Sequence, residues 1–484
     1  MRRLAFLLAV LALAAPGEVL TGTVVDEAGR PVAGARVRIR TEVHSVATDA
    51  SGRFVLADPK AAPGREITAA HPDHVIAGAT LKDGIFDYRL ALPAIPPGDD
   101  PTYLWVTAFP EDDQPPRTDF GREPCGACHR RILAEWQESA HARAATNPRF
   151  VAFAAATPGP CAACHVPMAE SPFADPRKAE GVAREGVGCD LCHKAARADV
   201  ASVTAFGASA LGLKRPPFGY MTVYGPFDDV PRGRDIFAPG FSESRFCATC
   251  HQLTLDGVPL YSEFEEWRRS PYATRGVTCQ SCHMQGDGKA TKAADLGPGQ
   301  IVRDAGMLSS HRFHDSRAPD LLAKAISLRL TARLEGDSVI AEVEVANVGA
   351  GHSLPAGSPL RHALLVVAAE SGDRALRLDD GPRLPGWSGI GFADRPGRAY
   401  ARLPTDREGK GPAMPWRDAV AADDTRIPAG GRDRASWRFR LDGAAPARVS
   451  ATLVIRRAFP GLAEAVGTDT GDIVAASKAT VVRR

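Results

Sequence analysis

The sequence predicts a multidomain protein in which a loop-rich central region with short helices lies between an N-terminal and a C-terminal β-sandwich. Alternating apolar residues bounded by turn signals, the pattern of half-buried strands, gather near the two ends of the chain. All 10 cysteines lie between these two regions. At 484 residues the chain is also too long for a single hydrophobic core, so about three domains are expected.

Residues 1–14 have the composition of a secretory signal. Arginines at positions 2 and 3 precede an apolar run over 4–13, and Ala12-Leu13-Ala14 offers a small-residue cleavage site. The run is shorter than the ~20 apolar residues that span a bilayer, and no later stretch reaches that length. We predict a cleaved signal peptide, with an uncleaved anchor as the alternative, and no transmembrane span. The protein is therefore expected to be periplasmic or secreted to the cell surface.

Residues 18–93 are expected to form the first β-sandwich. β-Branched runs at 19–25 and 37–40 are separated by a turn at 26–31, and a turn at 49–52 leads into the apolar run 54–56. The phrases GTVVDEAGRPVAGARVRI and TDASGRFVL resemble carboxypeptidase-regulatory-like (transthyretin-like) β modules. This resemblance implies a structural or interaction domain without catalytic residues.

A Pro- and Asp-rich linker is predicted over residues 94–124, with an apolar island at Tyr103-Leu104-Trp105 that would dock on a neighbouring domain. The region 125–318 has short helical patterns at 132–145 and 263–269, joined by long Gly- and Pro-rich loops. So many loops are unusual in a compact domain. A large apolar cofactor would supply the missing core.

The cysteines of this region form five CxxC pairs, and each pair is followed directly by histidine. The pairs and their histidines are Cys125, Cys128 and His129; Cys161, Cys164 and His165; Cys189, Cys192 and His193; Cys247, Cys250 and His251; and Cys279, Cys282 and His283. CxxCH is the attachment signal of c-type haem, whose iron takes the adjacent histidine as a ligand. We predict a multihaem cytochrome c domain with five covalently attached c-type haems.

Disulfides and structural zinc are the weaker interpretations of these pairs. Disulfides suit an oxidising compartment, but they give no reason for a histidine after every pair. A tetrahedral zinc site would use two pairs, so one of the five would be left over.

Strand alternation returns at residue 326, and residues 325–484 are expected to form the second β-sandwich. Apolar side chains share one face in the runs 326–334, 341–345, 437–441 and 449–455. Turn signals separate the runs, as in an antiparallel sandwich. The irregular stretch 381–431 is expected to be an insertion lying against the central domain.

The remaining histidines are candidates for the second axial position on iron. We expect His141, on the helix after the first motif, His311 in SSHRFHD and His352 in the Gly-rich loop NVGAGHSLPAG to ligate iron. His314 is a further candidate, and could instead only form a hydrogen bond. For the other four we expect a core or edge-strand position for His362 and surface positions for His44, His71 and His74, with ligation as the alternative.

At least one of the five haems has no credible second histidine by this count. Four methionines, Met168, Met221, Met284 and Met307, could supply a thioether ligand or simply pack against a macrocycle. An iron with an open position could bind a substrate. We expect Tyr261 and Tyr272 to pack on porphyrin, with a role beside such an open iron as the alternative.

The central region contains a weak internal repeat. Glu135-Trp136-x-x-Ser139-x-His141-Ala142 aligns with Glu266-Trp267-x-x-Ser270-x-Tyr272-Ala273, and each copy follows a CxxCH motif. The copies differ where His141 corresponds to Tyr272.

Five segments of the central region resemble the multihaem c-type cytochromes related to the tetrahaem electron carrier of ammonia oxidisers and to hydroxylamine oxidoreductase. These segments are CGACHRRILAEWQESAHA, EGVGCDLCHK, FCATCHQL, EFEEWRRSPYATRGVTCQSCHM and SHRF. The resemblance implies an axial role for His141, the histidine of EWxxSxHA. The chain departs from these families because it has five motifs rather than four or eight. It also lacks the haem motif of nitrite reductases, in which lysine replaces the proximal histidine. The resemblance is therefore weaker support for an enzymatic activity in this chain.

The chain has 59 Lys and Arg and 57 Asp and Glu, so its net charge is close to zero. It therefore lacks the excess of positive charge that is typical of nucleic-acid-binding proteins. Ten haem propionates would make the loaded protein acidic. Arg130, Arg131, Arg268 and Arg269 are candidate propionate partners, although a solvated surface position is the default expectation for them.

These observations predict an exported pentahaem c-type cytochrome that transfers electrons through closely packed haems. Five motifs within about 160 residues force the macrocycles together. Expected partners are redox proteins, either other cytochromes or membrane oxidoreductases, for which the β-sandwiches would be docking surfaces. The alternative is a multihaem oxidoreductase acting on a small nitrogen or sulfur compound at one open haem; the motifs favour the carrier over the enzyme. An oligomer built through haem contacts stays open.

Overall fold

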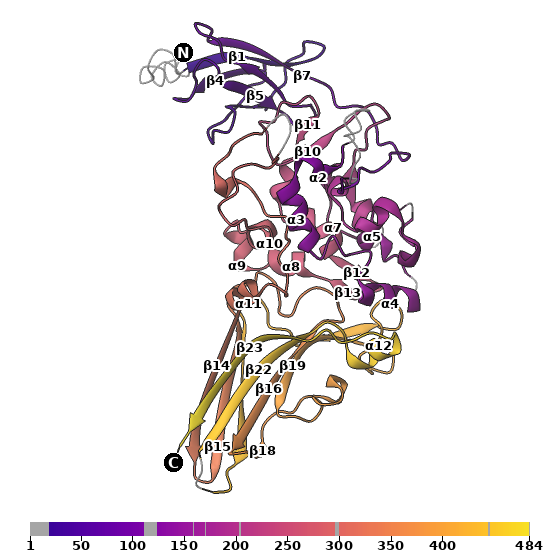
Figure 1. Cartoon of the computed structure of the whole chain (residues 1–484), viewed down its shortest axis with the longest axis vertical. Helices are drawn as coiled ribbons and strands as arrows, with labels where there is room; N and C mark the ends of the chain where they lie inside the picture. Colours follow the sequence, from indigo (N-terminus) through magenta and orange to yellow (C-terminus); the bar gives the residue numbers. More distant parts are fainter. Residues whose placement is uncertain are drawn as a thin grey trace.

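The computed structural model describes residues 19–110, 123–157, 159–169, 171–202, 205–295, 300–443 and 446–483, so the predicted signal peptide at 1–14 lies outside the described residues. A small β domain, a central domain of short helices and loops, and a long β domain follow one another along the molecule (Figure 1). The predicted fold class is confirmed. Within the described ranges, no helix has the length and apolar character needed to cross a membrane.

The N-terminal domain is a sandwich of two small sheets. One sheet has the order β4-β1-β7, and the other has the order β3-β2-β5-β6. The strands are β1 (Val19–Asp26), β2 (Arg36–Ile39), β3 (Val46–Ala47), β4 (Arg53–Ala57), β5 (Glu66–Ala70), β6 (Ala77–Thr80) and β7 (Asp87–Leu92). Alternate residues of β4 and β7 are buried, as in strands with one wet face, and their apolar sides meet around Val24, Ile39 and Leu56.

The central domain consists of short helices and three two-stranded ribbons. Its α-helices are α2 (Cys125–Cys128), α3 (Arg130–Glu138), α4 (Pro148–Ala156), α5 (Ala162–His165), α6 (Cys189–Cys192), α7 (Arg245–His251), α8 (Glu263–Arg268), α9 (Pro271–Thr274) and α10 (Cys279–His283). Its 3₁₀ helices are η1 (Pro176–Lys178), η2 (Gly181–Glu185), η3 (Gly207–Ala210), η4 (Pro239–Ser242) and η5 (Ala305–Met307). The ribbons pair β8 (Ala195–Ala198) with β9 (Leu211–Leu213), β10 (Val223–Gly225) with β11 (Asp235–Phe237), and β12 (Leu253–Leu255) with β13 (Val258–Tyr261).

The helix predicted over 132–145 is shorter than expected. Helix α3 ends at Glu138 because Ser139 adopts an extended conformation, and its N–H bonds back to the carbonyl of Trp136. The buried Ser139 hydroxyl then accepts from the N–H of Ala142 and closes a turn. The prediction that His141 lies on this helix is therefore wrong, since His141 lies in the turn that follows it.

The C-terminal domain begins with α11 (Pro319–Ala325) and is a sandwich of two antiparallel sheets. The first sheet has the order β14-β15-β21-β18, with strands Ile326–Glu335, Ser338–Asn347, Arg432–Arg440 and Arg377–Asp380. The second has the order β20-β19-β16-β22-β23, with strands Ala421–Asp424, Gly397–Thr405, His362–Ser371, Ala447–Arg456 and Ile473–Val482, and β17 (Arg374–Ala375) beside β16. Helices η6 (Gly386–Ser388) and α12 (Pro460–Ala465) complete the domain. Trp437, Phe439 and Leu453 lie in its core.

The prediction that 381–431 is an irregular insertion is wrong for part of this stretch. β19 lies inside it and pairs with β16 in the second sheet. The alternation of β19 is obscured in the sequence because one of its inward positions, Arg402, is buried and carries a charge. The stretch reaches the central domain at two places: Arg402 of β19 donates to Glu266 at 2.9 Å, and after β19 the indole of Trp416 donates to the hydroxyl of Thr157 at 2.7 Å.

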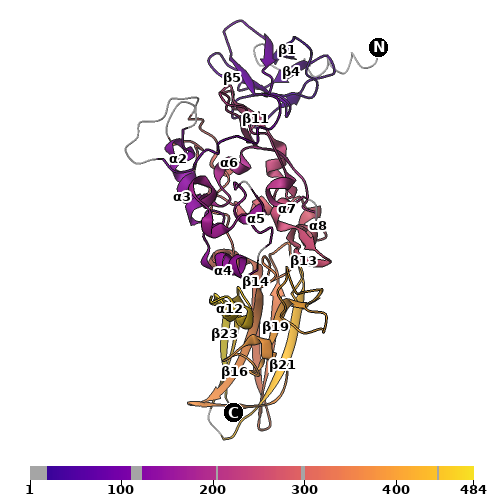
Figure 2. The ribbon, with the colours of Figure 1, turned by 90° about the vertical axis from the view of Figure 1, so that its right-hand side faces the viewer.

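The domains are joined by buried polar contacts. Arg303 donates to Asp229 at 2.8 Å, and the same carboxylate accepts from the backbone N–H of Thr41 in the N-terminal domain. Tyr103, in the apolar island of the linker, donates to Asp190 of α6 at 2.9 Å, so the expected docking of that island is confirmed. Both views place the central domain between the two β domains (Figures 1 and 2).

Candidate haem-binding site

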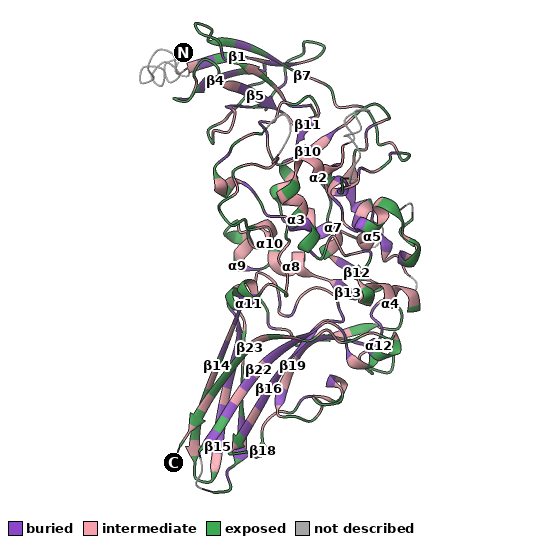
Figure 3. Cartoon of the chain, viewed as in Figure 1, coloured by how far each residue is buried: buried purple, intermediate pink, exposed green. Residues whose placement is uncertain are grey.

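A large cavity lies in the central domain and is closed on one side by residues of the C-terminal domain such as His352 and Arg361. Its volume is about 1890 Å³, whereas a pocket for one drug-sized ligand measures roughly 300–1,000 Å³. The polypeptide around it has little core of its own: helices α8, α9 and α10 contain no buried residue, and the two largest clusters of buried apolar residues lie in the N-terminal and C-terminal β domains (Figure 3). The cavity therefore takes the place of a hydrophobic core.

All 10 cysteines and five histidines of the CxxCH motifs line this cavity. The four further histidines predicted as ligands, His141, His311, His314 and His352, line it as well. Four of the CxxC pairs lie on one helical turn, and in the second motif Cys161 is the N-cap residue of α5 with a helical backbone conformation, so residues three apart share a face and both thiols of a pair point the same way. The donors predicted from the sequence are thus brought together around one space.

The cysteines form no disulfide, although every one of them lies in the described residues. Thiols of different motifs lie close together in three places: Cys125 beside Cys189, Cys164 beside Cys250, and Cys247 beside Cys279. Numbered in chain order, the first motif therefore adjoins the third, and the fourth adjoins the second and the fifth. In the described part of the chain, no group of three or more His, Cys, Asp or Glu is gathered as a metal cluster, which disfavours structural zinc.

Three motif histidines have a fixed ring orientation. His129 donates through Nδ1 to the carbonyl of Ala293 at 2.9 Å, and His193 does so to Tyr224 at 2.7 Å. His283 donates in the same way to the carbonyl of His314 at 2.6 Å. Because a carbonyl only accepts, the proton is on Nδ1, and Nε2 is left with the free lone pair that a metal needs.

Two histidine pairs face each other across the cavity. The ring centroids of His141 and His251 are 6.4 Å apart, and those of His283 and His352 are 6.2 Å apart with 20° between their planes. Such a separation leaves room for one metal ion with a nitrogen at about 2 Å on each side. The geometry of both pairs fits an iron between two imidazoles.

His311 lies near His193 in the same cavity. Burial, followed by the nearby His193, lowers the pKa of His311 to about 4. Burial and then the adjacent His251 lower the pKa of His141 to about 3 in the same way. Both imidazoles are therefore neutral at physiological pH, which is the form that binds metals. Their Nδ1 atoms have no hydrogen-bond partner among the described residues.

The remaining candidates divide between cavity and core. Met221, Met284 and Met307 line the cavity, but Met168 packs with Leu191 in a small apolar cluster. His362 is buried in β16, where it stacks on Phe459. His44, His71 and His74 belong to the N-terminal domain and do not line the cavity.

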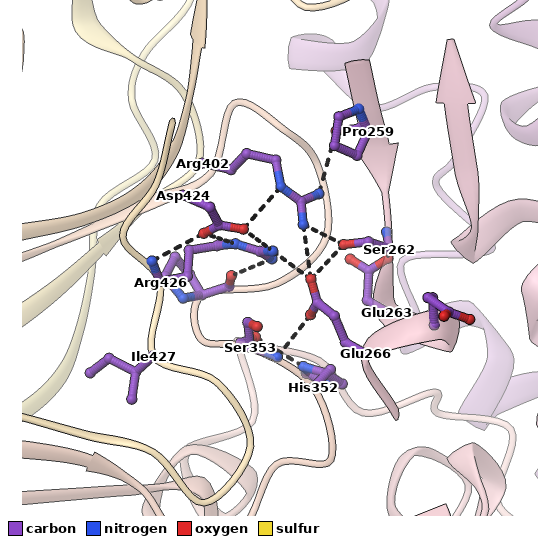
Figure 4. A network of polar contacts seen from close by, with 12 residues as sticks. Pro259, Ser262, Glu263, Glu266, His352, Ser353, Arg402, Asp424, Arg426 and Ile427 are labelled. Carbon is purple, nitrogen blue, oxygen red and sulfur yellow. Dashed lines mark hydrogen bonds and ion pairs between the residues drawn. The ribbon is translucent and has the colours of Figure 1, made fainter. Parts of the chain in front are cut away.

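The loop that carries His352 is held by an ionic network. Glu266 of α8 accepts from the backbone N–H of Ser353 at 2.8 Å through one carboxylate oxygen. Its other oxygen accepts from Arg402 at 2.9 Å and from Arg426 (Figure 4). Burial raises the pKa of Glu266, but the charge of Arg426 and the surrounding hydrogen bonds outweigh it and leave the pKa below its ordinary value. The ionised carboxylate of Glu266 thus connects the central domain to the C-terminal domain beside His352.

Two arginines in the cavity were not found by sequence reasoning. Arg361 and Arg457 line it, and the Nε of each is buried without a hydrogen-bond partner in the described residues. Arg131, which was a candidate for anion pairing, is bound by Glu135 instead. Arg268 and Arg269 pair with Glu265 on the surface, and Arg130 is exposed. No local motif marks Arg361 or Arg457, because both flank ordinary strands.

Comparisons with known proteins agree with this geometry. Residues 19–76 match the family described as "Carboxypeptidase regulatory-like domain", and residues 124–194 match the family described as "Cytochrome c554 and c-prime". The latter segment holds the first three CxxCH motifs. No curated protein matches the chain. The specific relation to the tetrahaem carrier of ammonia oxidisers is not among these findings.

Among solved structures, the chain is similar to a penta-heme cytochrome c552 from Thermochromatium tepidum, with a TM-score of 0.56 and 20% identity over 74% of this chain and 97% of that one. A PapD-like domain of human CEP192 and the Escherichia coli adhesin CfaE each cover 33% of this chain and 84% and 49% of their own, at 8% identity and TM-scores of 0.14 and 0.16. Only the first similarity supports a fold. A cytochrome c family implies covalently bound c-type haem, and these findings support a multihaem c-type cytochrome with a β domain on each side.

Proposed function

We propose that the protein is an exported pentahaem c-type cytochrome that transfers electrons. The observation that carries this proposal is the single cavity onto which all five CxxCH motifs and four further histidines converge. The penta-heme protein of similar fold supports the count of five. The apolar run and the cleavage signal at 1–14 support export to the periplasm or cell surface.

The cysteines of each motif would hold one haem through thioethers, and His129, His165, His193, His251 and His283 would ligate the irons. His311, His141 and His352 would be the second ligands opposite His193, His251 and His283. Each bound haem would supply a one-electron iron couple whose potential depends on the second ligand, burial and nearby charge. The carbonyl partners of the motif histidines keep their rings oriented during that chemistry.

The contacts between motifs support a continuous path for electrons. The first motif adjoins the third at Cys125 and Cys189, and Cys192 of the third motif lies near Cys250 of the fourth. The fourth motif adjoins both the second and the fifth. The resulting array is a chain from the first to the fifth motif with a branch at the fourth. Redox proteins that dock near either end of the chain would be its partners.

Purified mature protein tests the proposal directly. Its intact mass should show five covalent haems, and its low-temperature EPR spectrum should be mostly low-spin. A redox titration should show several one-electron steps. Mature protein without covalent porphyrin, produced in a host that matures cytochromes c, would overturn the proposal.

A second candidate function, reduction or oxidation of a small nitrogen or sulfur compound, is favoured by the surroundings of His165. The ring stacked on His165 is that of Phe150, at 4.1 Å, rather than another imidazole. The half-buried Tyr261 lies near Cys161, Cys164 and Arg361. A cationic group beside a motif without a paired histidine could receive a small oxyanion or a haem propionate.

Added nitrite, hydroxylamine and CO distinguish the two candidates. An enzyme should show a high-spin signal that these compounds change, together with turnover, whereas a pure carrier should be inert. Loss of the nitrite response in Arg361→Gln with five haems retained would assign the arginine to a free oxyanion. A shifted potential without any response to nitrite would assign it to a propionate.

A further inference from the structure

The two copies of the internal repeat place the same pair of side chains on two short helices. Glu135 and Trp136 lie on α3, and Glu266 and Trp267 lie on α8. Consecutive residues on a helix point about 100° apart, because 3.6 residues make a turn. Each helix can therefore hold two different segments of the chain at once, one through its glutamate and one through its tryptophan.

The tryptophans hold the segments that lead into CxxCH motifs. The indole N–H of Trp136 donates to the carbonyl of Val187 at 2.9 Å, and that of Trp267 donates to the carbonyl of Val277 at 2.8 Å. Each valine stands two residues before the first cysteine of a motif, Val187 before the third motif and Val277 before the fifth. The same bond thus fixes the approach to two different motifs.

The glutamates hold the loops that carry the facing histidines. Glu135 accepts from the backbone N–H of His311 at 2.8 Å and from the hydroxyl of Ser310 at 3.1 Å. Glu266 accepts from the backbone N–H of Ser353, the residue after His352, at 2.8 Å. In both copies a single carboxylate oxygen, Oε2, receives these bonds.

The other oxygen of each carboxylate is bound by arginine. Arg131 donates to Glu135 at 2.6 Å, and Arg402 and Arg426 donate to Glu266. Hydrogen bonds to ionised groups are roughly twice as strong as neutral ones. The cations therefore fix each carboxylate, and the fixed carboxylate in turn fixes the histidine loop.

We propose that each Glu-Trp pair is a clamp that sets the distance between the two histidines on opposite sides of one haem. Glu135-Trp136 holds His311 opposite His193, and Glu266-Trp267 holds His352 opposite His283. The four clamp residues are positioning residues, since they act through the histidines. This inference rests on the proposed function, because the histidines are ligands only if the haems are bound.

The clamp also explains which positions the repeat retains. The copies share Glu, Trp and Ser but differ at His141 and Tyr272. His141 faces His251 of the fourth motif, which neither clamp holds. Tyr272 instead supports the clamped loop, because its hydroxyl donates to the carbonyl of Val348 at 3.3 Å. The shared Glu and Trp make the clamp, and the residue at the variable position has a different contact in each copy.

Glu266→Ala and Glu266→Gln test the clamp in the full-length holoprotein, with Glu265→Gln as the matched control. Glu265 is the neighbouring residue on α8, but it pairs only with surface arginines. The variants should retain five haems by mass. We expect one haem in five to become high-spin and to bind CO in Glu266→Ala, and a smaller change in Glu266→Gln, which keeps a hydrogen-bond acceptor. The control should match the unmodified protein.

Trp267→Phe supplies a second measurement if Glu266→Ala does not fold, since phenylalanine keeps the ring and removes only the indole N–H. Its low-spin EPR signal from one haem should broaden. The clamp is refuted if Glu266→Gln and Trp267→Phe both leave the EPR spectrum and CO binding unchanged with five haems present. If His352→Ala also changes nothing, or if mass shows no haem, the proposed function itself has failed.

Discussion

His352 and His362 show how closely the role of a histidine depends on its surroundings. They are ten residues apart, but His352 lines the cavity in front of His283, and His362 is buried against Phe459. His352 lies in a Gly-rich loop, where the backbone can approach another group closely, whereas His362 belongs to a strand. The residue type is the same, and only the packing separates ligand from core.

His352→Met should raise the reduction potential of one haem, because a thioether ligand favours ferrous iron more than imidazole does. A redox titration followed at the haem absorption bands measures this change. His44→Met, in the N-terminal domain and away from the cavity, is the control and should leave every potential unaltered. A titration of His352→Met identical to that of the control would remove His352 from the ligand set.

At the scale of the element, the His352 loop depends on close approach of backbone. A Cβ added at Gly349 would lie 2.1 Å from the carbonyl oxygen of Lys324, a distance at which the chain must move. The loop leaves β15 at this point, so the movement would be transmitted to His352.

Gly349→Ala should therefore destabilise the protein by about 1–3 kcal/mol, the usual range for overpacking. It should also weaken the low-spin signal of one haem. Gly461→Ala is the control, because a Cβ at Gly461 meets no atom within 4 Å. Thermal unfolding and EPR of the two variants check the effect, and equal unfolding temperatures would contradict it.

The core of the C-terminal sandwich gives a separate prediction. Trp437 of β21 is 1% exposed, and its indole donates to the carbonyl of Pro382 at 2.8 Å. Trp437→Ala should cost about 3–5 kcal/mol of unfolding free energy, as is usual for a buried aromatic residue. Ile390→Ala, at a fully exposed position, should change it little. The unfolding free energies of the two variants, measured with denaturant, check this difference.

Elements with a simple pattern were predictable from the sequence, and elements shaped by neighbours were not. The alternating strands β14 and β22 follow from their apolar periodicity, whereas β19 was missed because buried Arg402 interrupts it. The donors of the site carry their own motif, so Cys189 and His193 could be named without a structure. Arg361 has no such signal, since its position in the cavity results from the docking of two domains.

At the scale of the whole molecule, the buried pair Asp229–Arg303 connects the N-terminal domain to the centre. The side chains are 1% and 3% exposed, and Asp229 also accepts from Thr41. Asp229→Asn should cost about 3–5 kcal/mol, because it leaves Arg303 buried without its counter-charge. Limited proteolysis should then release the N-terminal domain sooner. Asp83→Asn, on an exposed turn of the same domain, is the control and should be digested at the original rate.

Acid should loosen the same junction. Burial raises the pKa of Asp229, but the hydrogen bonds and charge of Arg303, the N–H of Thr41 and the charge of Arg38 outweigh it and hold the pKa below its ordinary value of 3.8. Because the pKa of Asp229 is lower in the folded protein, its carboxylate stabilises the folded state fully above the ordinary pKa. This stabilisation is lost as the pH falls through the lowered pKa. Proteolysis of the junction should therefore accelerate only below about pH 4. Acceleration between pH 5 and 7 would point to another group.

The position of His352 on the third domain has a consequence for biosynthesis. A chain that emerges N-terminus first presents Cys279, Cys282 and His283 to the maturation machinery well before the strands β15 and β16 exist. The fifth attachment can thus be complete while its second imidazole is still being exported. On the proposed function, the spin state of that iron would report whether the last domain has folded, so a truncated or misfolded product would differ from the finished one in its spectrum.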